Sequence, residues 1–132
     1  MPKEIEGKSA EEWFGDGNAS FSLKHYQVAI DCYENAVEID PKDKMVWDKL
    51  GYCYFSLNNY QNAIDSYEKA IKIFKENHIG FADFTYVWNY MGEAYSGLKK
   101  NQKAIEYYEK ALEIDPNFEK AKNNLKLLEP KR

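Results

Sequence analysis

Few side chains in this sequence have the chemistry of nucleophiles, general acids and bases, or soft metal ligands. The chain has two histidines, His25 and His78, and two cysteines, Cys32 and Cys53. The histidines fall in segments far apart along the chain and are expected to be solvated or bonded locally. The cysteines do not form a C-x-x-C pair, so we interpret them as reduced, structural thiols.

Motifs for phosphate and metal binding are also missing from the sequence. It contains no H-E-x-x-H, no EF-hand loop and no P-loop, and Gly15-Asp16-Gly17 falls inside an expected helix instead of following a strand. We therefore expect no catalytic site, no bound metal and no cofactor, and interpret the protein as not an enzyme.

Composition narrows the possible partners and compartments. The 132 residues are 44% hydrophobic and 16% aromatic, too rich for a disordered segment, and no apolar run is long enough to span a membrane. The net charge is -4 and the basic residues include a single arginine, Arg132, which speaks against a nucleic-acid surface. Residues 1–9 lack the apolar block of a secretory signal, so we expect a cytoplasmic protein that binds neither membrane nor nucleic acid.

The strongest signal in the sequence is an internal repeat. Trp13, Trp47 and Trp88 are 34 and 41 residues apart. Three further sets of residues keep both intervals: Gly17, Gly51 and Gly92; Ala29, Ala63 and Ala104; Tyr33, Tyr67 and Tyr108. Four positions in one register indicate three copies of one structural unit.

These residues resemble the tetratricopeptide repeat (TPR), whose pattern is W-x2-L-G-x2-Y, then A-x3-F, then P. The second copy lacks only the proline, and the third has Met91 in place of leucine. The first copy departs from the pattern at Asp16 and Ser20, as expected for a terminal repeat with one unburied face.

The resemblance implies an all-α fold, a right-handed TPR superhelix (α-solenoid) of about seven helices in antiparallel pairs, with the first helix of each pair lining a concave face. We expect one domain over residues 1–132, with repeats at 10–43, 44–84 and 85–118 and a capping helix over 117–128. The second repeat then contains a seven-residue insertion that lengthens its second helix. Residues 76–84, the segment that contains these extra residues, are expected to form a local packing plug or a corner that contacts a partner.

Local patterns support the same helices. Ser9 and Glu12 have the spacing of a capping box at the start of the first helix. Gly51 stands in the middle of an expected helix, which is tolerated where another helix approaches closely, and Tyr67 is expected to fill the gap between helix pairs.

A second stripe of side chains on the first helices is not needed for the core. Phenylalanine and tyrosine supply rigid contact area, and asparagine can pair with a peptide backbone as donor and acceptor. We therefore expect a groove that binds a protein or peptide partner, made of Phe14, Asn18, Phe21, Met45, Lys49, Tyr52, Phe55, Tyr86, Asn89, Tyr90, Asn123 and Asn124.

Two alternatives stay open. The aromatic side chains of this stripe, Phe21 and Phe55 in particular, can instead pack on each other or on neighbouring helices. The groove or the end of the solenoid can also serve self-association, which makes the protein a homo-oligomer.

One TPR subclass binds the acidic tails of heat-shock chaperones through a carboxylate clamp. The resemblance places Phe14, Asn18, Lys49, Tyr86 and Tyr90 at the clamp positions, and only Asn18 matches. We do not expect acidic chaperone tails to bind, although Lys49 can still hold one carboxylate.

Overall fold

The computed structural model describes residues 3–77 and 84–128. Within these residues the chain forms seven helices, which confirms the predicted all-α fold, and one short hairpin. The helices are α1 (Ala10–Ser22), α2 (Tyr26–Ile39), α3 (Lys44–Ser56), α4 (Tyr60–Asn77), α5 (Thr85–Gly97), α6 (Asn101–Ile114) and α7 (Glu119–Leu128), and the strands are β1 (Glu4–Ile5) and β2 (Lys8–Ser9). The chain forms two compact units, residues 1–78 and 79–132.

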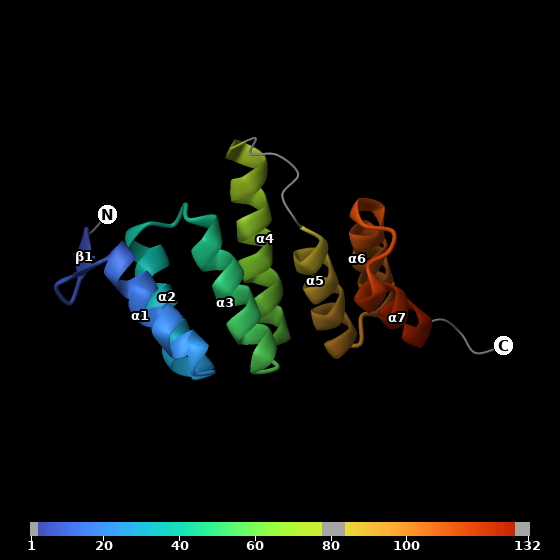
Figure 1. The fold of residues 1–132 in the computed structure, drawn as a ribbon, viewed down its shortest axis with the longest axis horizontal. Coiled ribbons are helices and arrows are strands. Elements are labelled where there is room, and N and C mark those ends of the chain that lie inside the picture. Colours follow the sequence, from blue (N-terminus) through green and yellow to red (C-terminus); the bar gives the residue numbers. More distant parts are fainter. Residues whose placement is uncertain (1–2, 78–83, 129–132) are drawn as a thin grey trace. The chain divides into compact units, whose positions relative to one another are not determined.

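The first unit holds the hairpin and two helix pairs, α1 with α2 and α3 with α4 (Figure 1). The second pair joins the first because α2 packs against α3. Buried side chains from α1, α2 and α3 form one core, in which Tyr33 and Leu50 are among the largest fully buried residues.

The repeated glycines are explained by the repeated tyrosines. A Cβ added to Gly51 would lie 2.6 Å from Cε1 of Tyr67, too close for any side chain. The ring therefore lies against the first helix of its own pair, α3.

Each helix pair is joined by a turn with one residue in the left-handed region. Lys24, Asn58 and Lys99 have φ values of 61°, 62° and 60° at equivalent places in the three repeats. Asparagine adopts this conformation more readily than lysine, so the turn of the second repeat has the best-suited residue.

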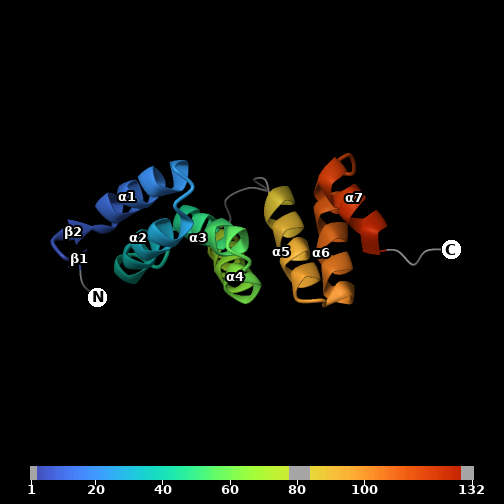
Figure 2. The ribbon, with the colours of Figure 1, turned by 90° about the horizontal axis from the view of Figure 1, so that it is seen from below.

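The N-terminal hairpin was not predicted. Its strands pair Glu4 with Ser9 and Ile5 with Lys8, and Glu6 and Gly7 between them both have positive φ, as a tight two-residue turn requires. Figure 2 shows the hairpin at the start of α1.

The start of α1 is fixed by two sets of contacts. The predicted capping box is present: the Glu12 N–H donates to Ser9 Oγ at 3.2 Å, and the Ser9 N–H donates to Glu12 Oε1 at 3.3 Å. The Trp13 indole N–H donates to the Ile5 carbonyl at 3.0 Å. The hairpin therefore covers the tryptophan of the first repeat.

The second helix of the middle repeat is longer than its counterparts, as predicted. Helix α4 has 18 residues, against 14 in α2. Most of the insertion, including His78, Ile79 and Phe81, lies outside the described residues. Phe84 is buried at the start of α5, with its ring 6.1 Å from that of Trp88.

The second unit consists of α5, α6 and α7 (Figure 2). Helix α7 begins at Glu119, two residues after the expected start of the capping helix, and packs on α6 with Ala121 buried. Stacked rings of Tyr95 and Tyr107, 5.2 Å apart, join α5 to α6.

Candidate functional site

The predicted binding residues of the first unit lie on α1 and α3. We call this set the α1–α3 face, and it consists of Phe14, Asn18, Phe21, Met45, Lys49, Tyr52 and Phe55. Along each helix the members are three or four residues apart, so they share one side of that helix. The side chains on this face differ in how much they are buried and in whether they contact the core.

Asn18 is held in a fixed orientation by the core. Its Oδ1 accepts a hydrogen bond from the Tyr33 hydroxyl at 2.6 Å. Burial raises the pKa of Tyr33 above its ordinary value, so the phenol keeps the proton it donates. The Asn18 NH2 group has no hydrogen-bond partner in residues 3–77 and 84–128, and is placed to donate to a ligand.

An aromatic cluster joins α1 to α3 at one end of the face. The ring of Phe21 lies 5.5 Å from that of Tyr52 and 5.8 Å from that of Tyr26, and Tyr26 and Tyr52 are 6.0 Å apart. The Lys49 ammonium lies 4.2 Å from the centre of the Phe21 ring. A cation in this position gains about 0.5–1 kcal/mol from the ring.

Lys49 is the cation of this face that has no local counter-charge. Its neighbour Asp48 is already paired with Lys44, whose Nζ lies 2.7 Å from Asp48 Oδ2. No carboxylate within the described part of the chain forms an ion pair with Lys49. A carboxylate from a partner therefore fits here without displacing an internal ion pair.

The other members of the α1–α3 face are placed as follows. Met45 is exposed, and Phe55 packs its ring 6.0 Å from that of Tyr60. Phe14 is half-buried, with its ring 5.9 Å from Tyr33, and packs against the core. The aromatic rings contact one another, as the packing alternative predicts. A polar, partly open surface remains beside them, which is compatible with partner binding.

In the second unit the expected residues lie on α5 and α7. We call this set the α5–α7 face, and it consists of Tyr86, Asn89, Tyr90, Asn123 and Asn124. Tyr86 is exposed with its ring 5.0 Å from that of Phe118, Tyr90 is half-buried, and Asn123 is exposed.

The assignment of Asn89 to the groove surface is wrong. Asn89 is only 1% exposed, and its Oδ1 accepts a hydrogen bond from Asn124 Nδ2 at 3.1 Å. Its own Nδ2 has no partner among the residues the structure describes. The packing of α7 on this unit converts a surface position of the repeat pattern into a buried polar one.

Glu93 is the acidic side chain beside this pair. Burial raises the pKa of its carboxyl, while a hydrogen bond from Asn124 and the charge of Lys120 act in the opposite direction.

The thiols have no reactive character. Cys32 and Cys53 are both buried and not in a disulfide. Burial raises the pKa of Cys53 to about 12 and that of Cys32 above its ordinary value, so neither provides a thiolate at neutral pH.

Sequence reasoning missed Tyr26 and Tyr60. Both stand at the first position of the second helix in their repeats, and their rings lie 5.8 Å from Phe21 and 6.0 Å from Phe55, respectively. The shared interval of 34 residues between the two tyrosines was the signal that could have identified them.

Two kinds of site are not formed by the described residues. In that part of the chain, no group of three or more histidine, cysteine, aspartate or glutamate side chains is arranged to hold a metal ion. None of the helices described has both the length and the apolar character needed to cross a membrane.

Comparison with protein families gives two matches, which cover separate parts of the chain. Residues 85–118 match the model described as "Tetratricopeptide repeat", and residues 15–83 match the model described as "CABIN1 N-terminal domain". The match over residues 15–83 spans just over half of the chain, so the chain belongs to the family of the CABIN1 N-terminal domain. The match over residues 85–118, together with the fold, identifies it as a tetratricopeptide repeat protein.

Solved TPR domains have the same fold. The first TPR of Spaghetti (RPAP3), bound to the HSP90 peptide SRMEEVD, is 27% identical, with a TM-score of 0.77 over 90% of this chain and 89% of that one. The first TPR domain of human RPAP3 is also 27% identical, with a TM-score of 0.73 over 90% and 88% of the two chains. The N-terminal domain of stress-induced protein-1 from C. elegans is 21% identical, with a TM-score of 0.78 over 92% and 94%, and supports the fold alone. No curated protein sequence matches the chain.

Proposed function

We propose that the protein is a non-enzymatic protein interaction module that binds a segment of a partner protein on the α1–α3 face, with the α5–α7 face as a second contact surface. Structural neighbours of this fold bind peptides, as the complex of Spaghetti with SRMEEVD illustrates. The observation that carries the proposal is the position of the Lys49 ammonium over the Phe21 ring. Lys49 forms no ion pair with a carboxylate in the described part of the chain. The Tyr52 ring lies beside that of Phe21.

The chemistry of the α1–α3 face favours a segment with one carboxylate and an apolar or aromatic side chain. Lys49 would bind the carboxylate, the Asn18 NH2 group would donate to a backbone carbonyl, and the Phe21 and Tyr52 rings would contact the apolar side chain. Phe14 replaces a clamp cation at the start of the face, so we expect the HSP90 peptide SRMEEVD to bind weakly or not at all.

Affinity capture from cells that express the protein tests this proposal. The native chain, a Lys49→Gln/Tyr52→Leu variant and a Val28→Ala control would each be used as bait, and captured proteins identified by mass spectrometry. Val28 is exposed on α2, outside both faces. We expect one set of partners with the native chain and the control and its loss with the double variant; equal capture by all three would contradict the proposal.

A second candidate function is self-association. Leu23 and Leu57 are exposed at equivalent places, directly after the last residues of α1 and α3. Exposed leucines at a regular interval favour a contact with a second copy of the chain. Sedimentation at several protein concentrations distinguishes the two functions, because a strict monomer at high concentration would exclude self-association.

A further inference from the structure

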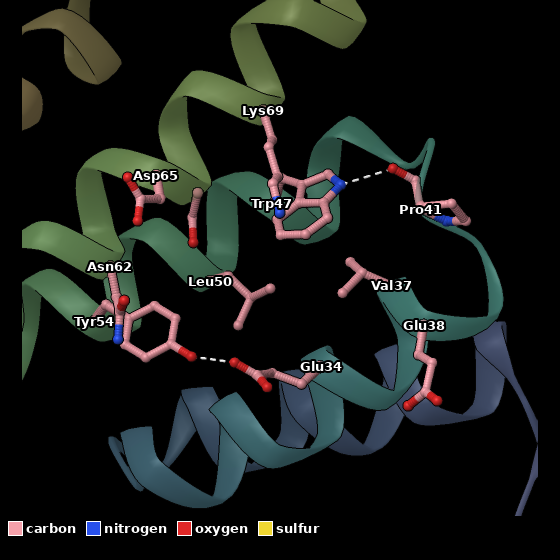
Figure 3. A pocket seen from close by; sticks show the side chains of 11 residues that line it. Glu34, Val37, Glu38, Pro41, Trp47, Leu50, Tyr54, Asn62, Asp65 and Lys69 are labelled. Carbon is pink, nitrogen blue, oxygen red and sulfur yellow. Dashed lines mark hydrogen bonds between the residues drawn. The ribbon is translucent and has the colours of Figure 1, made fainter.

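A pocket of about 530 Å³ lies in the first unit between α2, α3 and α4 (Figure 3). Val37, Trp47 and Leu50 supply its apolar wall. Trp47 and Lys49 are two residues apart on α3, which places them about 200° apart around the helix. The pocket is therefore on a different surface from the α1–α3 face and is not used by the proposed function.

The polar lining of the pocket is mainly acidic. Glu34, Glu38 and Asp65 contribute three carboxylates, against one ammonium from Lys69. Glu34 accepts a hydrogen bond from the Tyr54 hydroxyl, and Asp65 accepts one from a neighbouring glutamine on α4. Glu38 has neither an ion pair nor a hydrogen bond within the described residues. The pocket therefore complements a cation.

The tryptophan in the pocket already contacts a cation. The Lys69 ammonium lies 4.4 Å from the centre of the Trp47 ring (Figure 3). The Trp47 indole N–H donates to the Pro41 carbonyl at 2.8 Å, which fixes the orientation of the ring. A flexible lysine on a fixed indole can be replaced by a cation that makes better contacts, because exposed cation–π pairs contribute only about 0.5–1 kcal/mol.

A serine hydroxyl adds a hydrogen-bonding group to the pocket. Ser66 lines the pocket and is only 4% exposed. Its hydroxyl has no hydrogen-bond partner in residues 3–77 and 84–128 and is not among the buried unpartnered side-chain atoms, so it is open to the pocket. A donor from a ligand would satisfy it.

We infer that this pocket binds the arginine side chain of a basic segment of a partner protein. The planar guanidinium can stack on Trp47 in place of Lys69, and its five N–H donors suit the carboxylate of Asp65 and the hydroxyl of the adjacent Ser66. Glu38, on the opposite side of the pocket, adds negative charge (Figure 3). A lysine ammonium is a compact group and cannot stack and bind two separate acceptors in the same way. The protein would then hold two segments of different charge on two surfaces.

Titration with short peptides followed by NMR of the tryptophan indole N–H signals tests this inference. The probes are acetyl-Leu-Arg-Leu-amide, the same peptide with lysine, and the same peptide with citrulline, which has the shape of arginine without its charge. Trp47→Phe identifies the signal of the pocket. We expect the arginine peptide to shift that signal to saturation, the lysine peptide to bind at least about threefold more weakly, and the citrulline peptide to have no effect.

Variants of the native chain locate the site. Glu38→Gln and Asp65→Asn should each weaken binding of the arginine peptide by about threefold or more, and Lys69→Met should strengthen it. Glu106→Gln is the matched control, because Glu106 occupies in the third repeat the position of Asp65 and changes the net charge equally. It should leave the affinity unchanged.

Three results would overturn the inference: no shift of the Trp47 signal at millimolar peptide, equal affinity for the arginine and citrulline or lysine peptides, or equal weakening by Glu38→Gln and Glu106→Gln. The Lys49→Gln/Tyr52→Leu variant should bind the arginine peptide as the native chain does. The experiments can therefore contradict arginine binding in this pocket without contradicting partner binding on the α1–α3 face.

Discussion

The ring of Tyr33 fills the space that a side chain at Gly17 would occupy. A Cβ added to Gly17 would lie 2.5 Å from Cε1 of Tyr33, and the same relationship joins Gly92 to Tyr108 in the third repeat. The glycine of each repeat is therefore required by a tyrosine 16 residues later in the same helix pair.

Gly17→Ala should destabilise the protein and Gly15→Ala should stabilise it. Both glycines are in the interior of α1, where alanine is intrinsically preferred by up to ~1 kcal/mol. Gly15 has nothing within 4 Å of an added Cβ and should gain that amount, whereas overpacking against Tyr33 should cost Gly17→Ala about 1–3 kcal/mol. Urea denaturation of both variants measures the difference, and changes of the same sign would contradict the assigned role of Tyr33.

Replacing the left-handed lysines of the turns should stabilise the chain. Lys24→Gly and Lys99→Gly remove a side chain that disfavours φ near 60°, with an expected gain of about 0.5–1 kcal/mol each. Lys103→Gly in the first turn of α6 is the control and should lose up to about 1 kcal/mol. Thermal unfolding of the three variants measures the difference. If the turn variants lose as much stability as the control, these turns do not favour glycine.

Burial of Cys53 should make stability fall above pH 9. The pKa of the thiol rises from an ordinary value of 9.0 to about 12 in the folded chain, so the unfolded chain loses this proton first. The stability contributed by the neutral thiol is complete below pH 9 and is lost between pH 9 and 12, at up to about 1.4 kcal/mol per pH unit. Unfolding measurements at pH 8, 9 and 10 should give a shallower decline for Cys53→Ala than for the native chain, and identical slopes would contradict the buried thiol.

Asn124→Ala should destabilise the second unit, because it leaves the buried Oδ1 of Asn89 without its donor. The expected cost is about 1–3 kcal/mol. The neighbouring Asn123 is exposed, so Asn123→Ala should change stability by less than about 0.5 kcal/mol. Chemical denaturation of the two variants tests the pair, and equal effects would show that the hydrogen bond contributes nothing.

The helices could be predicted from the sequence because their signals are local and repeated. Glycine and tyrosine recur at fixed intervals, and the capping box of Ser9 and Glu12 spans a single helical turn. The hairpin was missed because its strands have two residues each and carry no hydrophobic alternation.

The site was less predictable because its geometry depends on contacts between distant residues. Asn89 is buried through a bond to a residue 35 positions later, which the repeat pattern does not encode. The pocket at Trp47 likewise combines residues of three helices, whereas the sequence shows Trp47 only as a member of the repeat pattern.

The binding role of the α1–α3 face is tested most directly by calorimetric titration of a captured partner segment into the native chain, Tyr52→Ala and Val28→Ala. Binding at this face predicts an affinity about tenfold or more lower for Tyr52→Ala and unchanged for Val28→Ala. Equal affinities for all three chains would contradict it.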